Sequence, residues 1–237
     1  MANHISFAND NNLKFSVPPF APFNSFSENS GCTGASVLAV QEVFNNLTLN
    51  LKLIDYPYAR IFKALKSGEL DLALIFKNST LKNDVAYIGP LSLSDIVIIT
   101  QKDIKLQRYE DLHELESIAV LRRIQINNRF DKDTALNKQN IGSLEQGIRM
   151  LKYNRVSAVI GSRIGLEYAL RMQDMDLSLM DNALHLGTKE WGLHLANKSL
   201  FMTDLPLISK AVKDTYEKDL IYRLYHRQLK HCPPPKF

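Results

Sequence analysis

Two stretches of the chain, one in each half, repeat the same order of helix end, tight turn and buried strand. The stretch "LKSGELDLALI" covers residues 65–75, and "LKYNRVSAVIG" covers residues 151–161. A gap-free alignment places Gly68 opposite Asn154, and these are the two residue types that most readily adopt a left-handed turn. Each repeat ends in a continuous apolar run, which is typical of a parallel strand buried on both faces. The sequence therefore predicts a strand–helix–strand unit in each half.

The first half contains further predicted strands and helices around its copy of the repeat. In chain order the predicted elements are a strand at 13–17, a helix at about 36–45, a strand at 49–55, a helix at 57–68 and a strand at 70–76. Pro18 and Pro19 end the first strand, because a central strand does not tolerate proline. Pro57 suits the first turn of the second helix, and Gly68 suits its C-terminus.

The second half follows the same order and adds one long helix. The predicted elements are a strand at 117–121, a helix at 143–154, a strand at 156–161, a helix at 163–173 and a single final helix from about 204 to 229. Ser143 and Gln146 form a capping box at the start of the first of these helices. Residues 95–103 and 191–198 are strand-like and connect the halves, so the chain crosses between them twice.

This order of elements predicts an α/β protein of two lobes, each with a mostly parallel sheet, joined by a two-strand hinge. The pattern alone leaves one alternative open, which is a single larger doubly wound domain. A cleft between lobes is a common place for a ligand, and a hinge allows the lobes to close over it. The arrangement favours a protein that binds a small molecule.

The composition excludes several classes of protein. With 45% hydrophobic and 23% charged residues, it is typical of a globular protein. The net charge of +4 is spread along the chain, which falls short of a nucleic-acid-binding surface. No apolar run approaches the roughly 18 residues that span a bilayer. The first residues, "MANHISFAND", lack the basic and apolar regions of a signal peptide, so we expect either a cytosolic protein or one whose signal has been removed.

The sequence predicts no catalytic or metal site. None of the six histidines has a metal-ligand spacing. The stretch "GSRIG" is not a nucleophile elbow, because Ser162 directly follows the first glycine. No pair of carboxylates stands out as an acid and a base. We therefore expect no enzyme activity, no metal and no other cofactor. Cys32 and Cys232 permit one disulfide without requiring it.

Over residues 13–229 the chain resembles the extracellular solute-binding proteins of family 3, which are bacterial periplasmic proteins with the type II binding fold. The resemblance rests on the order of "VPPF", "TGASVLAVQEV", "YARIFKALKSGELDLAL", "YIGPLSLSDIVIITQKD", "YEDL", "GIRMLKYNRVSAVIG" and "WGLHLANK". Its most specific piece is a helix followed by Gly-x-x-Asp. This piece ends at Asp71, whose carboxylate we expect to tie the local turn rather than to contact a ligand.

The resemblance implies that residues 1–97 and 191–237 form lobe one and that residues 98–190 form lobe two. It implies a periplasmic monomer that hands a small-molecule ligand to the membrane permease of an ABC transporter, with no nucleic-acid partner. It also puts Cys32 and Cys232 on lobe one, and it leaves undecided whether they form a disulfide. The alternatives are a ligand-sensing domain of a membrane receptor and a periplasmic enzyme on the same fold. The effector-binding half of a transcription regulator would need a DNA-binding segment that this chain lacks.

The chain departs at three places from the amino-acid binders of this family. Those proteins usually carry Thr-x-x-Arg after the buried strand of lobe one, and here Thr80 is followed by Asn83. They usually place an aspartate after the buried strand of lobe two, where this chain has Ser162. They usually have a glycine-containing turn after the first strand of lobe two, where this chain has Arg122 and Arg123. We therefore expect a small polar ligand, anionic or aromatic, rather than a standard α-amino acid.

Three kinds of side chain are predicted to contact this ligand. Arginines suit an anionic group, and aromatic residues that the resemblance places near the cleft suit stacking. Polar residues that follow buried strands lie at the edge where open α/β sheets bind ligands. The predicted ligand-binding residues are Phe20, Tyr58, Arg60, Phe76, Asn78, Ser79, Arg122, Arg123 and Ser162. Trp191 is expected at the boundary between the lobes.

Overall fold

The computed structural model describes residues 12–26, 32–122 and 124–232, and its strands form one eight-stranded sheet in the order β2-β1-β3-β8-β4-β7-β5-β6. The strands are β1 (Asn12–Ser16), β2 (Asn50–Leu53), β3 (Leu72–Phe76), β4 (Val85–Thr100), β5 (Ile118–Leu121), β6 (Lys138–Ile141), β7 (Ala158–Ser162) and β8 (Leu184–Ala196). The α-helices are α1 (Ala35–Phe44), α2 (Tyr58–Ser67), α3 (Asn128–Lys132), α4 (Leu144–Lys152), α5 (Arg163–Met172), α6 (Leu205–Thr215) and α7 (Leu220–His231). None of the helices in these ranges is long and apolar enough to cross a membrane.

The sheet is mixed, with a parallel group of strands at each end. Strands β2, β1 and β3 run parallel at one end, and β7, β5 and β6 run parallel at the other. Between these groups, β8 and β4 are antiparallel to their neighbours and to each other. A single doubly wound domain would continue the parallel order across the middle of the sheet. The α/β fold with two lobes and two crossing strands is thus confirmed.

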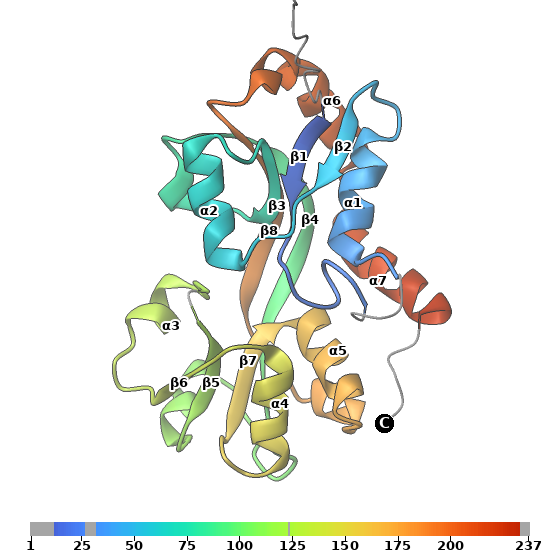
Figure 1. The fold of residues 1–237 in the computed structure, drawn as a ribbon. Coiled ribbons are helices and arrows are strands. Elements are labelled where there is room, and N and C mark those ends of the chain that lie inside the picture. The colour runs from blue at the N-terminus through green and yellow to red at the C-terminus, as the bar shows by residue number, and fades with distance from the viewer. Residues whose placement is uncertain (1–11, 27–31, 123, 233–237) are drawn as a thin grey trace, which may run out of the picture.

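Strands β4 and β8 run through both parts of the molecule (Figure 1). Lobe one contains β1–β3 with α1, α2, α6 and α7, and lobe two contains β5–β7 with α3, α4 and α5. The register between β4 and β8 shifts beside Gly89 and Pro90, where bulges accommodate a proline within a long strand. The predicted division into residues 1–97 with 191–237 and residues 98–190 cuts these two strands and stays a proposal.

Apolar side chains from alternate strand positions form a core on each face of each lobe. In lobe one, α1, α6 and α7 pack on one face of the sheet and α2 packs on the other. In lobe two, α4 and α5 cover one face. The other face is covered by α3 and a 3₁₀ helix, Tyr109–Glu114. Because both faces are covered, the two strands of the repeat, β3 and β7, are buried along almost their whole length, as the repeat predicted.

The repeated turn is confirmed in both lobes. Helix α2 is followed by Gly68, whose φ is 81°, and its N–H bonds back to the carbonyl of Leu65. In the second copy, Asn154 has a φ of 53°. The predicted N-cap also forms, since the Ser143 hydroxyl accepts a hydrogen bond of 3.1 Å from the Gln146 N–H. The Gln146 side chain bonds one residue earlier than expected, to the N–H of Gly142.

The expectation of one final helix from 204 to 229 is wrong, because the chain leaves the helical path between α6 and α7. The carbonyl of Lys218 accepts hydrogen bonds from the Leu93 N–H, at 2.8 Å, and from the Ser92 hydroxyl, at 3.0 Å. The Ser92 oxygen in turn accepts a bond of 3.3 Å from the N–H of Ile221, at the start of α7. This pairing with β4 breaks the helix, and the apolar periodicity of the segment gives no sign of it.

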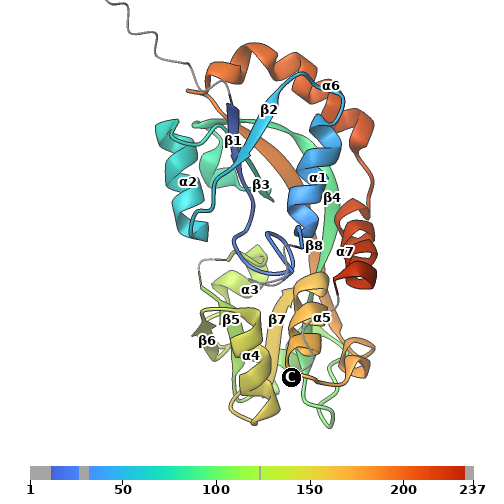
Figure 2. The same cartoon turned by 45° about the vertical axis from the view of Figure 1, so that its right-hand side comes forward.

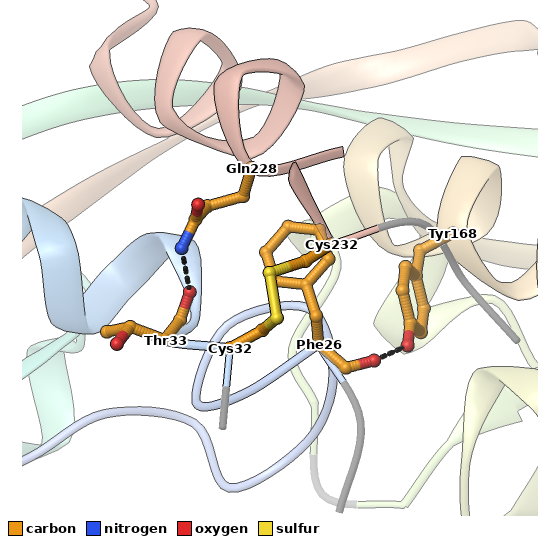
Figure 3. Close-up of a disulfide and its surroundings, with 6 residues drawn as sticks. All are labelled: Phe26, Cys32, Thr33, Tyr168, Gln228 and Cys232. Carbon is orange, nitrogen blue, oxygen red and sulfur yellow. Dashed lines mark hydrogen bonds between the residues drawn. A yellow bond between two sulfur atoms is a disulfide. The ribbon is translucent and has the colours of Figure 1, made fainter. Parts of the chain in front are cut away.

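A disulfide joins the end of α7 to the loop before α1, which answers the question that the sequence left open (Figure 3). The Cα atoms of Cys32 and Cys232 are 6.1 Å apart, and the bond spans a sequence separation of 200 residues. Beside it, the Gln228 side chain donates a hydrogen bond of 2.9 Å to the carbonyl of Thr33. The loop before α1 is therefore fixed to the last helix.

The same loop touches lobe two. The ring of Phe26 stacks on Tyr225 of α7, with centroids 5.8 Å apart, and packs edge-on against Tyr168 of α5 at 5.9 Å. The Tyr168 hydroxyl donates a hydrogen bond to the carbonyl of Phe26 (Figure 3). Helices α5 and α7 accordingly lie side by side in both views (Figure 1, Figure 2). This contact between the lobes is separate from the crossing strands.

Candidate ligand-binding site between the lobes

A small cavity lies where the two lobes meet, and both lobes and both crossing strands contribute to it. It is lined by Pro18, Phe20, Phe23, Tyr58, Phe76, Ile96, Leu121, Ile124, Ile126, Leu144, Ile160, Gly161, Ser162 and Trp191. Its volume of about 20 Å³ holds one water molecule or little more. The lobes are thus closed on one another in this structure, and a ligand of any size would have to enter while they are apart.

Aromatic rings form the lobe-one side of this cavity. Phe76, at the end of β3, pairs in register with Trp191 of β8, and their ring centroids are 4.0 Å apart. Trp191 also meets Phe23, with ring centroids 5.0 Å apart. Phe20 continues the row, 5.7 Å from Phe23 and 6.1 Å from Tyr58 at the start of α2. Phe20 and Phe23 belong to the segment that follows Pro18 and Pro19 after β1.

The polar groups of the lining are hydroxyls and an indole N–H. The Ser162 hydroxyl caps α5 by accepting a bond of 3.3 Å from the Gly165 N–H, which leaves its own O–H able to donate. Burial raises the pKa of Tyr58, so its hydroxyl keeps its proton. The Trp191 side chain is 2% exposed, and its Nε1 has no hydrogen-bond partner among the described residues. No described residue of the lining carries a charge.

Ile124 and Ile126 of the lobe-two side come from the segment after β5, which hydrogen bonds hold at several points. The N–H of Ile126 donates a hydrogen bond of 3.0 Å to Asp131 Oδ1. The Asn127 side chain donates to the carbonyl of Leu186 on β8, at 2.8 Å. Lys189 Nζ donates to the carbonyl of Gln125. These bonds hold Ile126 and its neighbours against the aromatic row.

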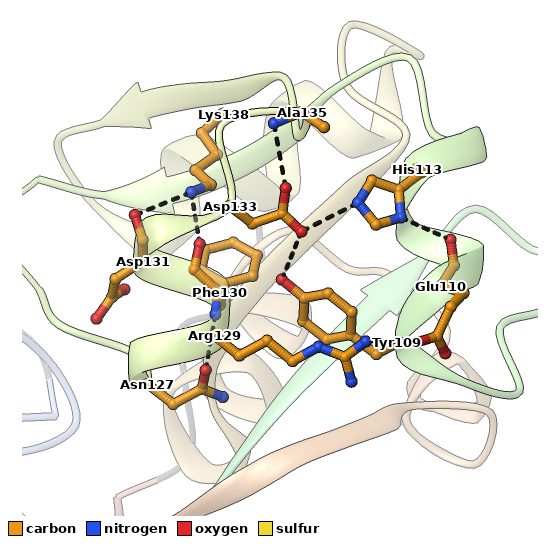
Figure 4. A network of polar contacts seen from close by, with 10 residues as sticks. All are labelled: Tyr109, Glu110, His113, Asn127, Arg129, Phe130, Asp131, Asp133, Ala135 and Lys138. Atoms are coloured by element: carbon orange, nitrogen blue, oxygen red, sulfur yellow. Dashed lines mark hydrogen bonds and ion pairs between the residues drawn. The ribbon is translucent and has the colours of Figure 1, made fainter.

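A polar network stabilises the helix that follows this segment (Figure 4). Asp133 Oδ2 accepts a hydrogen bond of 3.0 Å from the Tyr109 hydroxyl and lies 3.0 Å from His113 Nε2. The Arg129 guanidinium stacks on the Tyr109 ring at 3.6 Å. Lys138 Nζ donates to the carbonyl of Phe130, at 2.5 Å. These contacts fix α3 to the rest of lobe two.

Four of the predicted ligand-binding residues lie together in the cavity lining. They are Phe20, Tyr58, Phe76 and Ser162. Trp191 lies with them rather than only at the lobe boundary. Whether any of these side chains contacts a ligand stays a prediction.

The other predicted residues lie outside the lining. Arg60 Nη2 pairs with both oxygens of Glu69 at 2.9 Å on an exposed surface. The Asn78 side chain caps a 3₁₀ turn by accepting from the Thr80 N–H at 2.9 Å, and Ser79 is exposed beside it. Arg122 is also exposed. Arg123 lies outside the residues that the structure describes.

The Asp71 carboxylate has a structural role, but the expectation that it ties its own turn is wrong, because its partners are distant in sequence. Its carboxylate accepts a hydrogen bond of 2.9 Å from the Lys14 N–H on β1 and another of 2.7 Å from the Ser199 hydroxyl. It therefore ties β3 to β1 and to the turn after β8.

Sequence reasoning missed the aliphatic part of the lining. Ile124 and Ile126 alternate with Gln125 directly after the basic pair, and this alternation is typical of a segment with one buried side. Phe23 gave no comparable signal, because it lies in a proline-rich loop without periodicity.

Among the described residues, no group of three or more histidine, cysteine, aspartate or glutamate side chains could hold a metal ion.

A family model described as bacterial extracellular solute-binding proteins, family 3, matches residues 14–225. No curated protein sequence matches the chain. The fold is similar to an ancestral arginine-binding protein bound to arginine, with a TM-score of 0.71 and 16% identity over 92% of this chain and 98% of that chain. It is similar to an ancestral amino acid-binding protein described as a precursor of cyclohexadienyl dehydratase, with a TM-score of 0.71 and 13% identity over 92% of this chain and 95% of that chain. It is also similar to a histidine kinase sensor domain with similarity to periplasmic binding proteins, with a TM-score of 0.70 and 13% identity over 93% of this chain and 95% of that chain. These likenesses establish the type II periplasmic-binding fold.

Proposed function

Because the chain belongs to the bacterial extracellular solute-binding proteins of family 3, we propose that it captures a small solute between its two lobes. The observation that carries this proposal is the cavity, whose walls come from lobe one, from lobe two and from both crossing strands. Such a cavity can exist only when the lobes are together, so closure and capture are the same event. We propose further that the protein is a periplasmic monomer that delivers its solute to an ABC transporter.

The solute proposed here is not a standard α-amino acid. The structural neighbours include a protein bound to arginine, and such ligands need a counter-charge for the carboxylate. Thr80 and Asn83, at the positions of the usual Thr-x-x-Arg clamp, lie outside the cavity lining. The lining also offers no carboxylate for an ammonium group among the described residues.

A role without catalysis is favoured by the same lining. Acid–base chemistry needs a group that gains or loses a proton near neutral pH. The described lining contains no histidine or carboxylate, and burial raises the pKa of Tyr58. An enzyme such as a dehydratase would therefore lack a base in this cavity.

A screen of small molecules by melting temperature tests the proposal, with the single tryptophan of the chain, Trp191, as an independent probe of the site. A solute at 100 times its Kd should stabilise the protein by about 2.7 kcal/mol and change the Trp191 emission. If organic acids, amino acids, amines, nucleosides and neutral aromatics all leave both signals unchanged, capture of a small solute is contradicted.

The likeness to a histidine kinase sensor domain supports a second candidate, a ligand-sensing domain. Deleting the gene separates the two roles once a solute is known. Loss of uptake of the radiolabelled solute is expected for a transporter partner, whereas normal uptake with loss of a transcriptional response would indicate a sensor.

A further inference from the structure

We propose that the captured solute is uncharged, has a flat apolar body, and accepts a hydrogen bond from Trp191 Nε1. This inference rests on the proposed function and adds the chemical class of the ligand. It replaces the expectation of an anionic solute, which depended on Arg60, Arg122 and Arg123.

The described walls of the cavity provide no partner for a charge. A buried ion without a counter-charge loses its hydration and gains nothing in return. Among the described residues, Lys189 brings a cation near the aromatic row, with its Nζ 5.5 Å from the centroid of the Phe76 ring. That ammonium donates to the carbonyl of Gln125, and burial lowers its pKa. Lys189 thus serves the contact between β8 and the segment after β5.

The nearby acidic group is also paired. Glu190 Oε2 lies 3.0 Å from Lys77 Nζ and accepts a hydrogen bond of 2.9 Å from the Tyr87 hydroxyl. This carboxylate is therefore already paired with a cation, and it does not belong to the cavity lining. A cation, an anion or a zwitterion would each enter the described lining unpaired.

The shape of the lining suits a flat ring. Phe20, Phe23, Phe76 and Trp191 form an aromatic row on one side, in which Phe76 and Trp191 are 33° from parallel while Phe20 is edge-on to Phe23, and the other side is aliphatic. When the lobes separate, Ile124 and Ile126 leave this row together with lobe two. The closed cavity seen here holds little more than one water molecule. A planar solute laid on these rings would therefore be covered by the same isoleucines in a closed form in which the lobes stand farther apart than here, and aromatic pairs of this kind add to the energy of burial.

Trp191 Nε1 determines which polar group the solute needs, namely a hydrogen-bond acceptor. A buried N–H without an acceptor is destabilising, and few such groups occur in folded proteins. This one belongs to a side chain that lines the cavity and is 2% exposed. A carbonyl, ether or ring nitrogen of the solute would satisfy it, while the hydroxyls of Tyr58 and Ser162 can donate further bonds.

A set of probes that share one ring tests the ligand class on the full chain. Benzamide is neutral with an acceptor, benzoate is an anion, benzylammonium is a cation, phenylalanine is a zwitterion, and toluene lacks an acceptor. Binding is followed by Trp191 emission and by melting temperature. We expect benzamide to bind at least tenfold more tightly than each of the charged probes, and more tightly than toluene.

Two variants assign the contacts. In Trp191→Phe, read by melting temperature, the affinity for benzamide should fall about tenfold while that for toluene stays within about twofold. Tyr58→Phe gives a second test in case the first variant folds poorly, with Tyr56→Phe as its matched control. Tyr56 lies two positions earlier, and its hydroxyl bonds to Glu69 on the surface.

The outcomes separate this inference from the proposed function. Tighter binding of benzoate or phenylalanine, weakened by Arg123→Gln or Arg60→Gln, would overturn the ligand class while leaving solute capture intact. Equal loss of benzamide and toluene binding in Trp191→Phe would overturn the role of the indole N–H. If no probe binds and the broader screen is also silent, solute capture fails and the ligand class fails with it.

Discussion

The rings of Phe76 and Trp191 stack with their centroids 4.0 Å apart and their planes 33° from parallel. Phe76 packs against the main core of lobe one and also against a core of lobe two. Trp191 is held in the middle of this contact by β8, one of the two strands that cross between the lobes. Separation of the lobes would therefore change the surroundings of this pair, and we expect the Trp191 emission to report that change.

Replacing Phe76 with alanine should expose Trp191 to solvent. We expect its emission maximum to move to longer wavelength and its quenching by acrylamide to increase. The free energy of unfolding should fall by about 2 kcal/mol, less than for a fully buried phenylalanine because Phe76 is only partly covered. Tyr153→Ala, at a position that is 64% exposed on lobe two, is the control. An unchanged emission spectrum in Phe76→Ala would show that this ring does not shield Trp191.

A buried histidine predicts how stability depends on pH. His194 is 1% exposed, its Nδ1 lies 3.0 Å from the carbonyl of Gly192, and its Nε2 has no partner among the described residues. Burial lowers its pKa from 6.5 to about 4. Between these two values the unfolded chain binds a proton that the folded protein does not. The free energy of unfolding should therefore decrease as the pH falls through this window, by roughly 3 kcal/mol in total.

The variant His194→Phe should lose that part of the pH dependence. Urea unfolding at pH 7, 5.5 and 4 measures it, and His231→Phe, at an exposed position, serves as the control. Parallel pH curves for the wild type and His194→Phe would mean that the folded protein accommodates a charged imidazole at this site.

The disulfide between Cys32 and Cys232 should be a large contributor to stability. It closes a loop with a sequence separation of 200 residues, which restricts the unfolded chain strongly. Reduction should lower the free energy of unfolding by roughly 3–5 kcal/mol in urea titrations. The double variant Cys32→Ser, Cys232→Ser should show the lower value with and without reductant. A non-reducing intact mass without the loss of two hydrogens, or a melting temperature indifferent to reductant, would contradict the bond.

The sequence predicted those parts of the fold that consecutive residues encode. Helix ends at Gly68 and Ser143 follow from the conformations that glycine and serine favour, and the structure has both. The break between α6 and α7 could not be predicted in this way, because it depends on bonds from Lys218 to Ser92 and Leu93, far away in the chain.

The candidate site was predicted less completely for a related reason. Its aromatic residues can be predicted from the sequence by their residue type and by their position at strand and helix ends. Ile124 and Ile126 become part of a cavity only when lobe two closes on Phe76 and Trp191. Arg60 looked like a ligand because arginine suits anions, yet Glu69 of the same helix–turn unit takes its charge. Residue type alone does not show whether a charged side chain is already paired within the protein.

The repeated turn offers a last test, since its two copies are occupied by different residues. At Gly68 the φ of 81° is unfavourable for any side chain, and an added Cβ would lie 2.8 Å from the Cβ of Lys198. Gly68→Ala should therefore lower the free energy of unfolding by about 1–2 kcal/mol. Asn154→Ala should cost about 1 kcal/mol for the same backbone reason, at a φ of 53°.

Asn154→Gly is the matched control for both. It keeps the left-handed turn and loses only the bond of 3.0 Å that the Asn154 side chain accepts from Gln101, so its stability should stay within about 0.5 kcal/mol of the wild type. Urea titrations compare the three variants. If Asn154→Gly were as unstable as Asn154→Ala, the hydrogen bond of the side chain rather than the backbone conformation would explain why asparagine occupies this position. The two turns would then have the same backbone shape but would be stabilised by different interactions.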